Sequence, residues 1–210
     1  MEGRCVKAAN KTRLPLYGTI VFALVLYPAT AQAHLVSTGM GPVYDGLMHF
    51  VASPEDLVPA LALALLAGLR GAAYGRRTLF VLPAAWLVGG LAGFAAATVN
   101  ASAVLTAITF LLLGGLVALD AKLSLRATTA LAALLGLYHG YLNGAGMGQP
   151  GVASLALLGL AAAVFMLVAL AAALVVQLQA AWARIAVRVI GSWIVASGLL
   201  MLGWNLRGRL

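Results

Sequence analysis

The stretch VASLALLGLAAAVFMLVALAAALVVQL, residues 152–178, contains no charged side chain. As a helix it extends about 40 Å at about 1.5 Å per residue, which exceeds the roughly 30 Å hydrocarbon core of a bilayer. A soluble protein would have to bury such a helix on all sides, whereas a membrane surrounds it with lipid. The segment therefore predicts a transmembrane helix.

The rest of the chain has the same character. Of its 210 residues, 63% are hydrophobic and 9% are charged, and the mean hydropathy is +1.04. Soluble domains carry about 25% charged residues, so a soluble enzyme, a nucleic-acid-binding module and a disordered regulator are excluded. We expect an all-α, polytopic membrane helical bundle with six transmembrane helices. The other five predicted spans are residues 54–70, 78–99, 101–120, 127–147 and 185–206.

Residues 1–33 have the features of a cleavable secretory signal peptide. A basic start precedes an apolar stretch, and Ala31-Gln32-Ala33 fits the small-x-small rule for signal peptidase. Residues 34–210 would then form a single transmembrane domain that lacks the one cysteine of the chain, Cys5. This domain would begin at His34, whose α-amine and ring Nδ1 form a chelating pair for Cu(II) or Ni(II). An uncleaved first span is the alternative interpretation.

The distribution of cations predicts the topology. Loops on one side of the predicted spans hold seven Lys and Arg residues, whereas the other side holds only Arg207 and Arg209. Because positive side chains stay on the cytoplasmic side, both mature termini are expected in the periplasm, outside a bacterial inner membrane. The net charge of +8 therefore reflects topology, and no nucleic-acid partner is expected. The seven cytoplasmic cations are Arg70, Arg76, Arg77, Lys122, Arg126, Arg184 and Arg188.

Residues 40–52 predict a short periplasmic-side helix ahead of the first span. Ser53 is a typical N-cap, Pro54 suits a first helical position, and the acids Glu55 and Asp56 favour the positive end of the helix dipole. A new helix is therefore expected to start here. Interrupted helices of this kind often mark substrate sites in transporters, and an amphipathic helix lying on the membrane surface is the alternative.

Ionisable side chains inside a membrane are costly and tend to be functional. Asp45 and His49 lie four residues apart on one face of the predicted short helix, and His139 and Asn143 are spaced in the same way in the fourth span. The topology places both pairs on the periplasmic side. Carboxylate and imidazole are suitable ligands for Ni, Co, Zn or Cu. We therefore predict a site for a transported or transiently bound metal ion, without a tightly bound cofactor, formed by His34, Asp45, His49, His139 and Asn143.

The two pairs occur in similar strings. Residues 44–49 read YDGLMH and residues 138–143 read YHGYLN, so both have a ligand-capable side chain at the second and sixth places. The similarity indicates an internal pseudo-repeat or two converging half-sites, with chance as the alternative. The fourth span also has a ridge of small residues, which allows close helix packing in lipid. The alternative to a metal site is therefore that His139 and Asn143 serve only as interhelical hydrogen-bonding groups. The ridge consists of Gly136, Gly140, Gly144 and Gly148.

At these residues the chain resembles the HupE/UreJ family, small membrane proteins associated with hydrogenase and urease operons. Members often begin with Ala-His at the mature end, as Ala33-His34 does here, and carry a His…Asp-His motif near the first span. A later Phe-His-Gly-x-Ala-His-Gly-x-Glu motif reads YHGYLNGAG here, with Asn143 and Gly146 in place of the second histidine and the glutamate. The resemblance implies a divergent nickel or cobalt permease. It carries the metal site over to His139 and, more loosely, to His34, Asp45 and His49.

The sequence does not predict an enzyme. Rhomboid proteases share the His139-x-x-x-Asn143 spacing, but their mechanism needs a histidine base after the serine, and no histidine follows His139. The expected function is passive or weakly coupled transfer of a divalent transition metal from periplasm to cytoplasm. The alternatives are copper handling, or a non-transporting accessory or assembly subunit of a membrane metalloenzyme. Expected partners are lipid, the metal ion, and a metalloenzyme or further copies of the chain.

Asp120 is the only acid on the predicted cytoplasmic side. We expect it to pair with Lys122, Arg126 or Arg70 and thereby anchor a helix end. The alternative is that this lone anion draws the metal ion out of the pathway.

Reporter fusions test the predicted topology. A fusion after Arg76 is expected to report the cytoplasm and a fusion at the C-terminus the periplasm, because the cation asymmetry fixes the orientation of the spans. Finding both reporters in one compartment would contradict the six-span arrangement.

Overall fold

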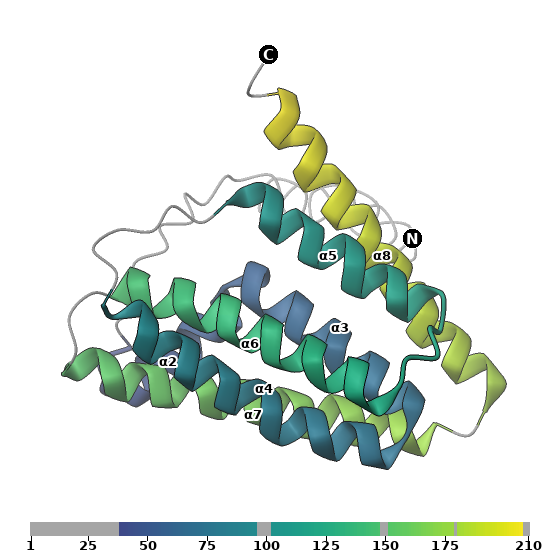
Figure 1. Cartoon of the computed structure of the whole chain (residues 1–210), viewed down its shortest axis with the longest axis horizontal. Coiled ribbons are helices and arrows are strands. Elements are labelled where there is room, and N and C mark those ends of the chain that lie inside the picture. Colours follow the sequence, from purple (N-terminus) through teal and green to yellow (C-terminus); the bar gives the residue numbers. More distant parts are fainter. Residues whose placement is uncertain (1–37, 96–101, 148–150, 179, 208–210) are drawn as a thin grey trace, which may run out of the picture. The chain divides into compact units, whose positions relative to one another are not determined.

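The computed structural model describes residues 38–95, 102–147, 151–178 and 180–207, so the predicted signal peptide and His34 lie outside the described residues. Within these ranges the secondary structure is entirely helical (Figure 1). The helices are α2 (Pro42–Ala52), α3 (Pro54–Arg70), α4 (Ala72–Gly93), α5 (Ala103–Ala118), α6 (Leu125–Met147), α7 (Val152–Gln177) and α8 (Ala181–Arg207).

Each expected span has a helix, and the largest difference is in α4. This helix begins at Ala72 and ends at Gly93, where the sequence predicted 78–99. The prediction began the span at the first apolar residues, but arginine is a good helix former, so the helix continues back through Arg76 and Arg77 to the break at Gly71. By length and hydropathy, α7 and α8 are clear candidate membrane spans, and α2 with α3 would count as a third.

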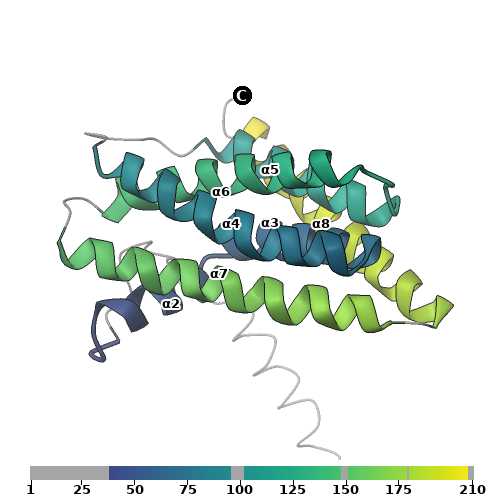
Figure 2. The same ribbon diagram turned by 60° about the horizontal axis from the view of Figure 1, so that its bottom comes forward.

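The predicted break between the short helix and the first span is present. The axes of α2 and α3 are bent by 76°, and Ser53 occupies the N-cap position of α3, although its side chain makes no capping hydrogen bond. α2 packs across the start of α7 (Figure 2), where Gly46 lies against the backbone of Ala156 and Gly159 against that of Val43. This packing fixes α2 to the bundle beside the start of α3.

α4 and α6 pack with their backbones in close contact. A side chain at Gly140 would collide with the carbonyl group of Trp86, and one at Gly144 with that of Gly90. Glycines of α4 lie equally close to α6, since a side chain at Gly89 would collide with the backbone of Leu137. The predicted small-residue ridge of α6 is confirmed for its first three glycines, and Gly148 lies outside the described residues.

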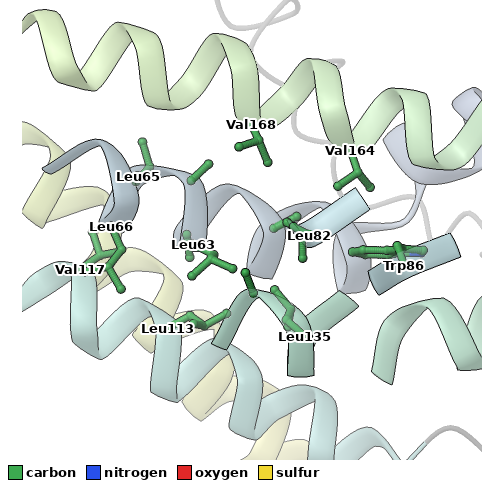
Figure 3. Packing of buried hydrophobic residues seen from close by; sticks show 14 of the residues in the cluster. Leu63, Leu65, Leu66, Leu82, Trp86, Leu113, Val117, Leu135, Val164 and Val168 are labelled. Atoms are coloured by element: carbon green, nitrogen blue, oxygen red, sulfur yellow. The ribbon is translucent and has the colours of Figure 1, made fainter. Parts of the chain in front are cut away.

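α3 lies at the centre of the described bundle and contacts every other described helix. Its side chains Leu63 and Leu66 are fully buried, and Figure 3 shows Leu66 beside Val117 and Leu63 near Leu113 of α5. Seventeen residues reach only about 25 Å. This short helix is therefore surrounded by protein for most of its length.

α5 and α8 lie side by side (Figure 1) and are joined to the other helices mainly through α3. Asp120, which follows α5, forms ion pairs with Arg70 at the end of α3 and with Arg184 of α8, the latter at 3.2 Å. The expected pair with Arg70 is therefore present. Lys122 and Arg126 form no ion pair within the described ranges, and the second partner instead comes from a helix distant in the sequence. The cluster ties together the ends of three helices.

Substitution at the glycine ridge tests the α4–α6 packing. We expect Gly140→Ala to destabilise the protein by about 1–3 kcal/mol, as overpacking does, because the new methyl group meets rigid backbone at Trp86. Gly146→Ala in the same helix is the matched control, since nothing lies within 4 Å of a side chain there. Thermal unfolding in detergent measures the difference, and equal Tm values for the two variants would contradict this packing.

Candidate metal-binding site

Four polar side chains form one hydrogen-bonded cluster where the α2–α3 junction meets α6. His139 Nδ1 lies 2.7 Å from Asp56 Oδ1, and the Asn143 amide nitrogen donates to Asp56 Oδ2 at 2.9 Å. His49 Nε2 lies 3.1 Å from Asn143 Oδ1. Both oxygens of the Asp56 carboxylate are thus hydrogen-bonded, and the cluster links α2, α3 and α6.

Local helix geometry explains why these side chains converge. His139 and Asn143 lie one turn apart on α6, and the Asn143 amide also donates to the His139 carbonyl oxygen at 2.8 Å. Asp56 belongs to the first turn of α3, directly after the bend, and its side chain is buried whereas its neighbours Pro54 and Glu55 are exposed. His49 is in the last turn of α2, so it approaches the cluster from the other side of the bend.

The cluster is buried, and its hydrogen bonds have a defined direction. Asp56 is 5% exposed, His139 1% and Asn143 8%. A carboxylate accepts hydrogen bonds and cannot donate them when ionised, so His139 Nδ1 and the Asn143 amide are the donors to Asp56. The Asn143 oxygen in turn accepts from His49 Nε2. Because a buried charge is costly without partners, these donors are what stabilise Asp56 in the interior.

His139 Nε2 has a different environment from Nδ1. It is buried and has no hydrogen-bond partner among the described residues. When Nδ1 donates to Asp56, a neutral ring has its lone pair at Nε2; metal-binding histidines are oriented by a carboxylate in the same way. The ring is held between aromatic neighbours, with centroid distances of 5.5 Å to Trp86 and 5.1 Å to Tyr138. The imidazole is therefore fixed through Nδ1 and its aromatic neighbours, with Nε2 as its free nitrogen among the described residues.

The structure brings together three of the five predicted site residues. His49, His139 and Asn143 meet, and the contact between His49 and Asn143 joins the sixth places of the two similar strings. Asp45 is not in the cluster: one of its carboxylate oxygens accepts hydrogen bonds from the backbone N–H and the hydroxyl of Thr38, at 2.6 and 2.7 Å. His34 lies outside the described residues.

Asp56 is the functional residue that the sequence interpretation missed. The sequence interpretation placed the Asp56 carboxylate at the positive end of the α3 dipole, which explains an acid at this position equally well. The available signal was its place directly after the break of an interrupted helix, where transporters form their sites. In the part of the chain that the structure describes, no three His, Cys, Asp or Glu side chains come together as a preformed metal site.

Comparison with known protein families identifies the family of this chain. A family model described as HupE / UreJ protein matches residues 22–201. The chain belongs to the HupE/UreJ family. Comparison with curated proteins and with solved structures gives no match. Membership of the HupE/UreJ family, together with the apolar helices, indicates a membrane protein, and it suggests a nickel- or cobalt-related permease or accessory function rather than an enzyme.

Adjacent acids allow a controlled test of the cluster. Asp56→Ala leaves two buried donors without an acceptor, and each unpaired buried group costs about 1–3 kcal/mol, so we expect a clear loss of thermal stability. Glu55→Ala removes an acid of the same helical turn that is exposed and makes no such contact. Thermal unfolding in detergent compares the two. A Tm for Asp56→Ala equal to that of Glu55→Ala would show that the cluster does not stabilise the fold.

Proposed function

We propose that this HupE/UreJ protein is a permease that moves a divalent transition metal ion, nickel or cobalt as the family suggests, from periplasm to cytoplasm. The observation that carries the proposal is the buried, unpartnered Nε2 of His139, whose ring is oriented by Asp56. Ionisable groups within a membrane are costly, so those that are present tend to be functional. The metal ion is the transported substrate and binds to the site only transiently.

The residues of the cluster take different roles in this proposal. His49 is half-buried and receives the ion from the periplasmic side, Asn143 is a neutral second contact, and His139 Nε2 is the innermost ligand. Asp56 does not ligate the ion; it positions His139 and balances its charge. Asp45 helps to capture the metal ion only when its hydrogen bonds to Thr38 break. His34 would contact the ion before Asp45 and His49 do.

The arrangement of α8 supports a membrane-spanning orientation. Trp182 and Trp204 are both exposed and lie 22 residues apart, a rise of about 33 Å, which matches a bilayer core with tryptophans at its two interfaces. The end of the bundle with Asp120 holds the predicted cytoplasmic cations. We assign this end to the cytoplasm, the cluster end to the periplasm, and one span to each of α3–α8 in a bacterial inner membrane.

An accessory or assembly subunit of a membrane metalloenzyme is the second candidate. The observation in its favour is that most polar atoms of the cluster are already satisfied by one another, and no three strong ligands converge in the described ranges. A protein of this kind would bind a partner and carry no ion. Copper is the alternative metal in either case, because imidazole binds it well.

Metal accumulation in cells that express the protein tests the proposal, with nickel, cobalt, copper and zinc compared. We expect the parent to accumulate nickel or cobalt, His139→Ala to abolish this uptake, and Asp56→Asn to lower it by about 10-fold or more, the effect typical of a group that orients a metal-binding histidine. Glu55→Gln is the matched control and is expected to transport normally. Protein levels in the membrane are measured in parallel.

Two results would contradict the permease. Unchanged uptake by His139→Ala would remove the proposed ligand, and an expressed parent that accumulates none of the four metals would favour the accessory role. If copper alone accumulates, transport stands and the assignment of nickel or cobalt is wrong.

A further inference from the structure

The end of the bundle that carries Asp120 has far more cations than acids. The other described acids, Asp45, Glu55 and Asp56, belong to α2 and the first turn of α3, at the opposite end of α3 from Arg70. Asp120 already binds Arg70 and Arg184, one through each carboxylate oxygen. The remaining cations at this end therefore have no carboxylate of the described chain left to bind.

Arg76 and Arg77 are the most notable of these cations. Both are exposed in the second turn of α4, and neither forms an ion pair within the described ranges. Two positive charges on consecutive residues, without a carboxylate partner in the described ranges, favour an anion that binds within reach of both. They lie in α4 directly ahead of the predicted span 78–99, which puts them at the depth of lipid headgroups.

A groove of about 490 Å³ lies between the starts of α4 and α6. Its cationic part is formed by Arg76 and Arg77, and its other lining is apolar, including Phe80, which is 64% exposed. A second groove, of about 250 Å³, lies on the opposite flank of α4 against α7 and shares Arg76. The lining residues of the first groove are Ala73, Arg76, Arg77, Phe80, Val81 and Leu125.

The groove has two chemical halves along α4. Arg76 and Arg77 come first, and Phe80 and Val81 follow one turn later, toward the middle of the helix. A free phosphate ion would match only the first half, and a neutral acyl chain only the second. A molecule with a phosphate joined to an acyl chain matches both, because arginine binds phosphate through paired hydrogen bonds and the aromatic and aliphatic side chains contact hydrocarbon.

We propose that this groove is a binding site for one anionic phospholipid of the surrounding membrane. The lipid phosphate lies between Arg76 and Arg77, and an acyl chain runs along Phe80, Val81 and Leu125. Basic pockets between transmembrane helices on the cytoplasmic side have this preference for acidic headgroups. A zwitterionic lipid is disfavoured because its ammonium group lies beside two guanidinium groups.

The site also fits the packing of α4 against α6. The close backbone contacts between these helices begin at Leu82 and Gly136 and continue toward their far ends. The groove occupies the opposite end of the pair, ahead of these contacts. A lipid bound there covers apolar surface of both helices and neutralises the two arginines together.

Native mass spectrometry of the detergent-purified full chain tests the proposal. The probes are dioleoylphosphatidylglycerol, dioleoylphosphatidylcholine and inorganic phosphate. We expect one phosphatidylglycerol to be retained in preference to phosphatidylcholine, and inorganic phosphate not to compete with it. In Arg76→Gln/Arg77→Gln the affinity is expected to fall about 25-fold, since each cation near an anionic surface contributes about fivefold.

Two further variants separate the site from general surface charge. Lys122→Gln/Arg188→Gln removes the same charge from the same end without touching the groove, and it is expected to keep the lipid. Arg76→Lys/Arg77→Lys keeps the charge but loses the paired hydrogen bonds, and it is expected to bind with intermediate affinity. The proposal is overturned if the two double Gln variants lose phosphatidylglycerol equally, if both lipids bind the parent alike, or if inorganic phosphate displaces the lipid.

Discussion

The buried carboxylate of Asp56 is the constraint on which the described bundle depends. An ionised acid in the interior of an apolar protein has to receive hydrogen bonds from the protein itself. Here the donors come from α6, and a further donor from α2 acts through Asn143. The carboxylate therefore fixes the register of α6 against α3, the proton position on His139 and the orientation of the Asn143 amide. Its two oxygens join α3 to α6, and the hydrogen bond between His49 and Asn143 adds α2 to the cluster.

The glycine contacts and the cluster depend on each other. Gly140 allows α6 to touch the backbone of α4 at Trp86, and the neighbouring residue His139 is thereby brought beside the Trp86 indole ring. A larger residue at position 140 would move the imidazole away from Asp56 as well as from Trp86. Close packing without a hydrophobic driving force, which small residues make possible in membranes, is here also the means by which the candidate ligand is positioned.

The sequence predicted most of the architecture and part of the candidate site. Helical segments, the break at Ser53 and the glycine ridge depend on local composition, which is visible in one chain. Asp45 and Asp56 show the limit of such reasoning. Asp45 shares a helix face with His49, but at the start of α2 its carboxylate turns back to Thr38. Asp56 joins the cluster where α3 starts after the 76° bend and meets α6, a tertiary contact that spacing does not encode. The Arg184 partner of Asp120 likewise depends on how α8 packs.

α3 has a charged side chain near each end, and each is bound by side chains of other helices. This explains how so short a helix can lie within the bundle. Asp56 and Arg70 lie about 21 Å apart along it, less than the thickness of a bilayer core. Neither end needs to reach the lipid headgroups.

The ion pair at the Arg70 end also bears on the role of Asp120. This carboxylate binds two guanidinium groups, so the three side chains together have a net positive charge. A cluster of net positive charge does not attract a cation, so these ion pairs favour the anchoring role expected for Asp120 over the alternative of an ion exit.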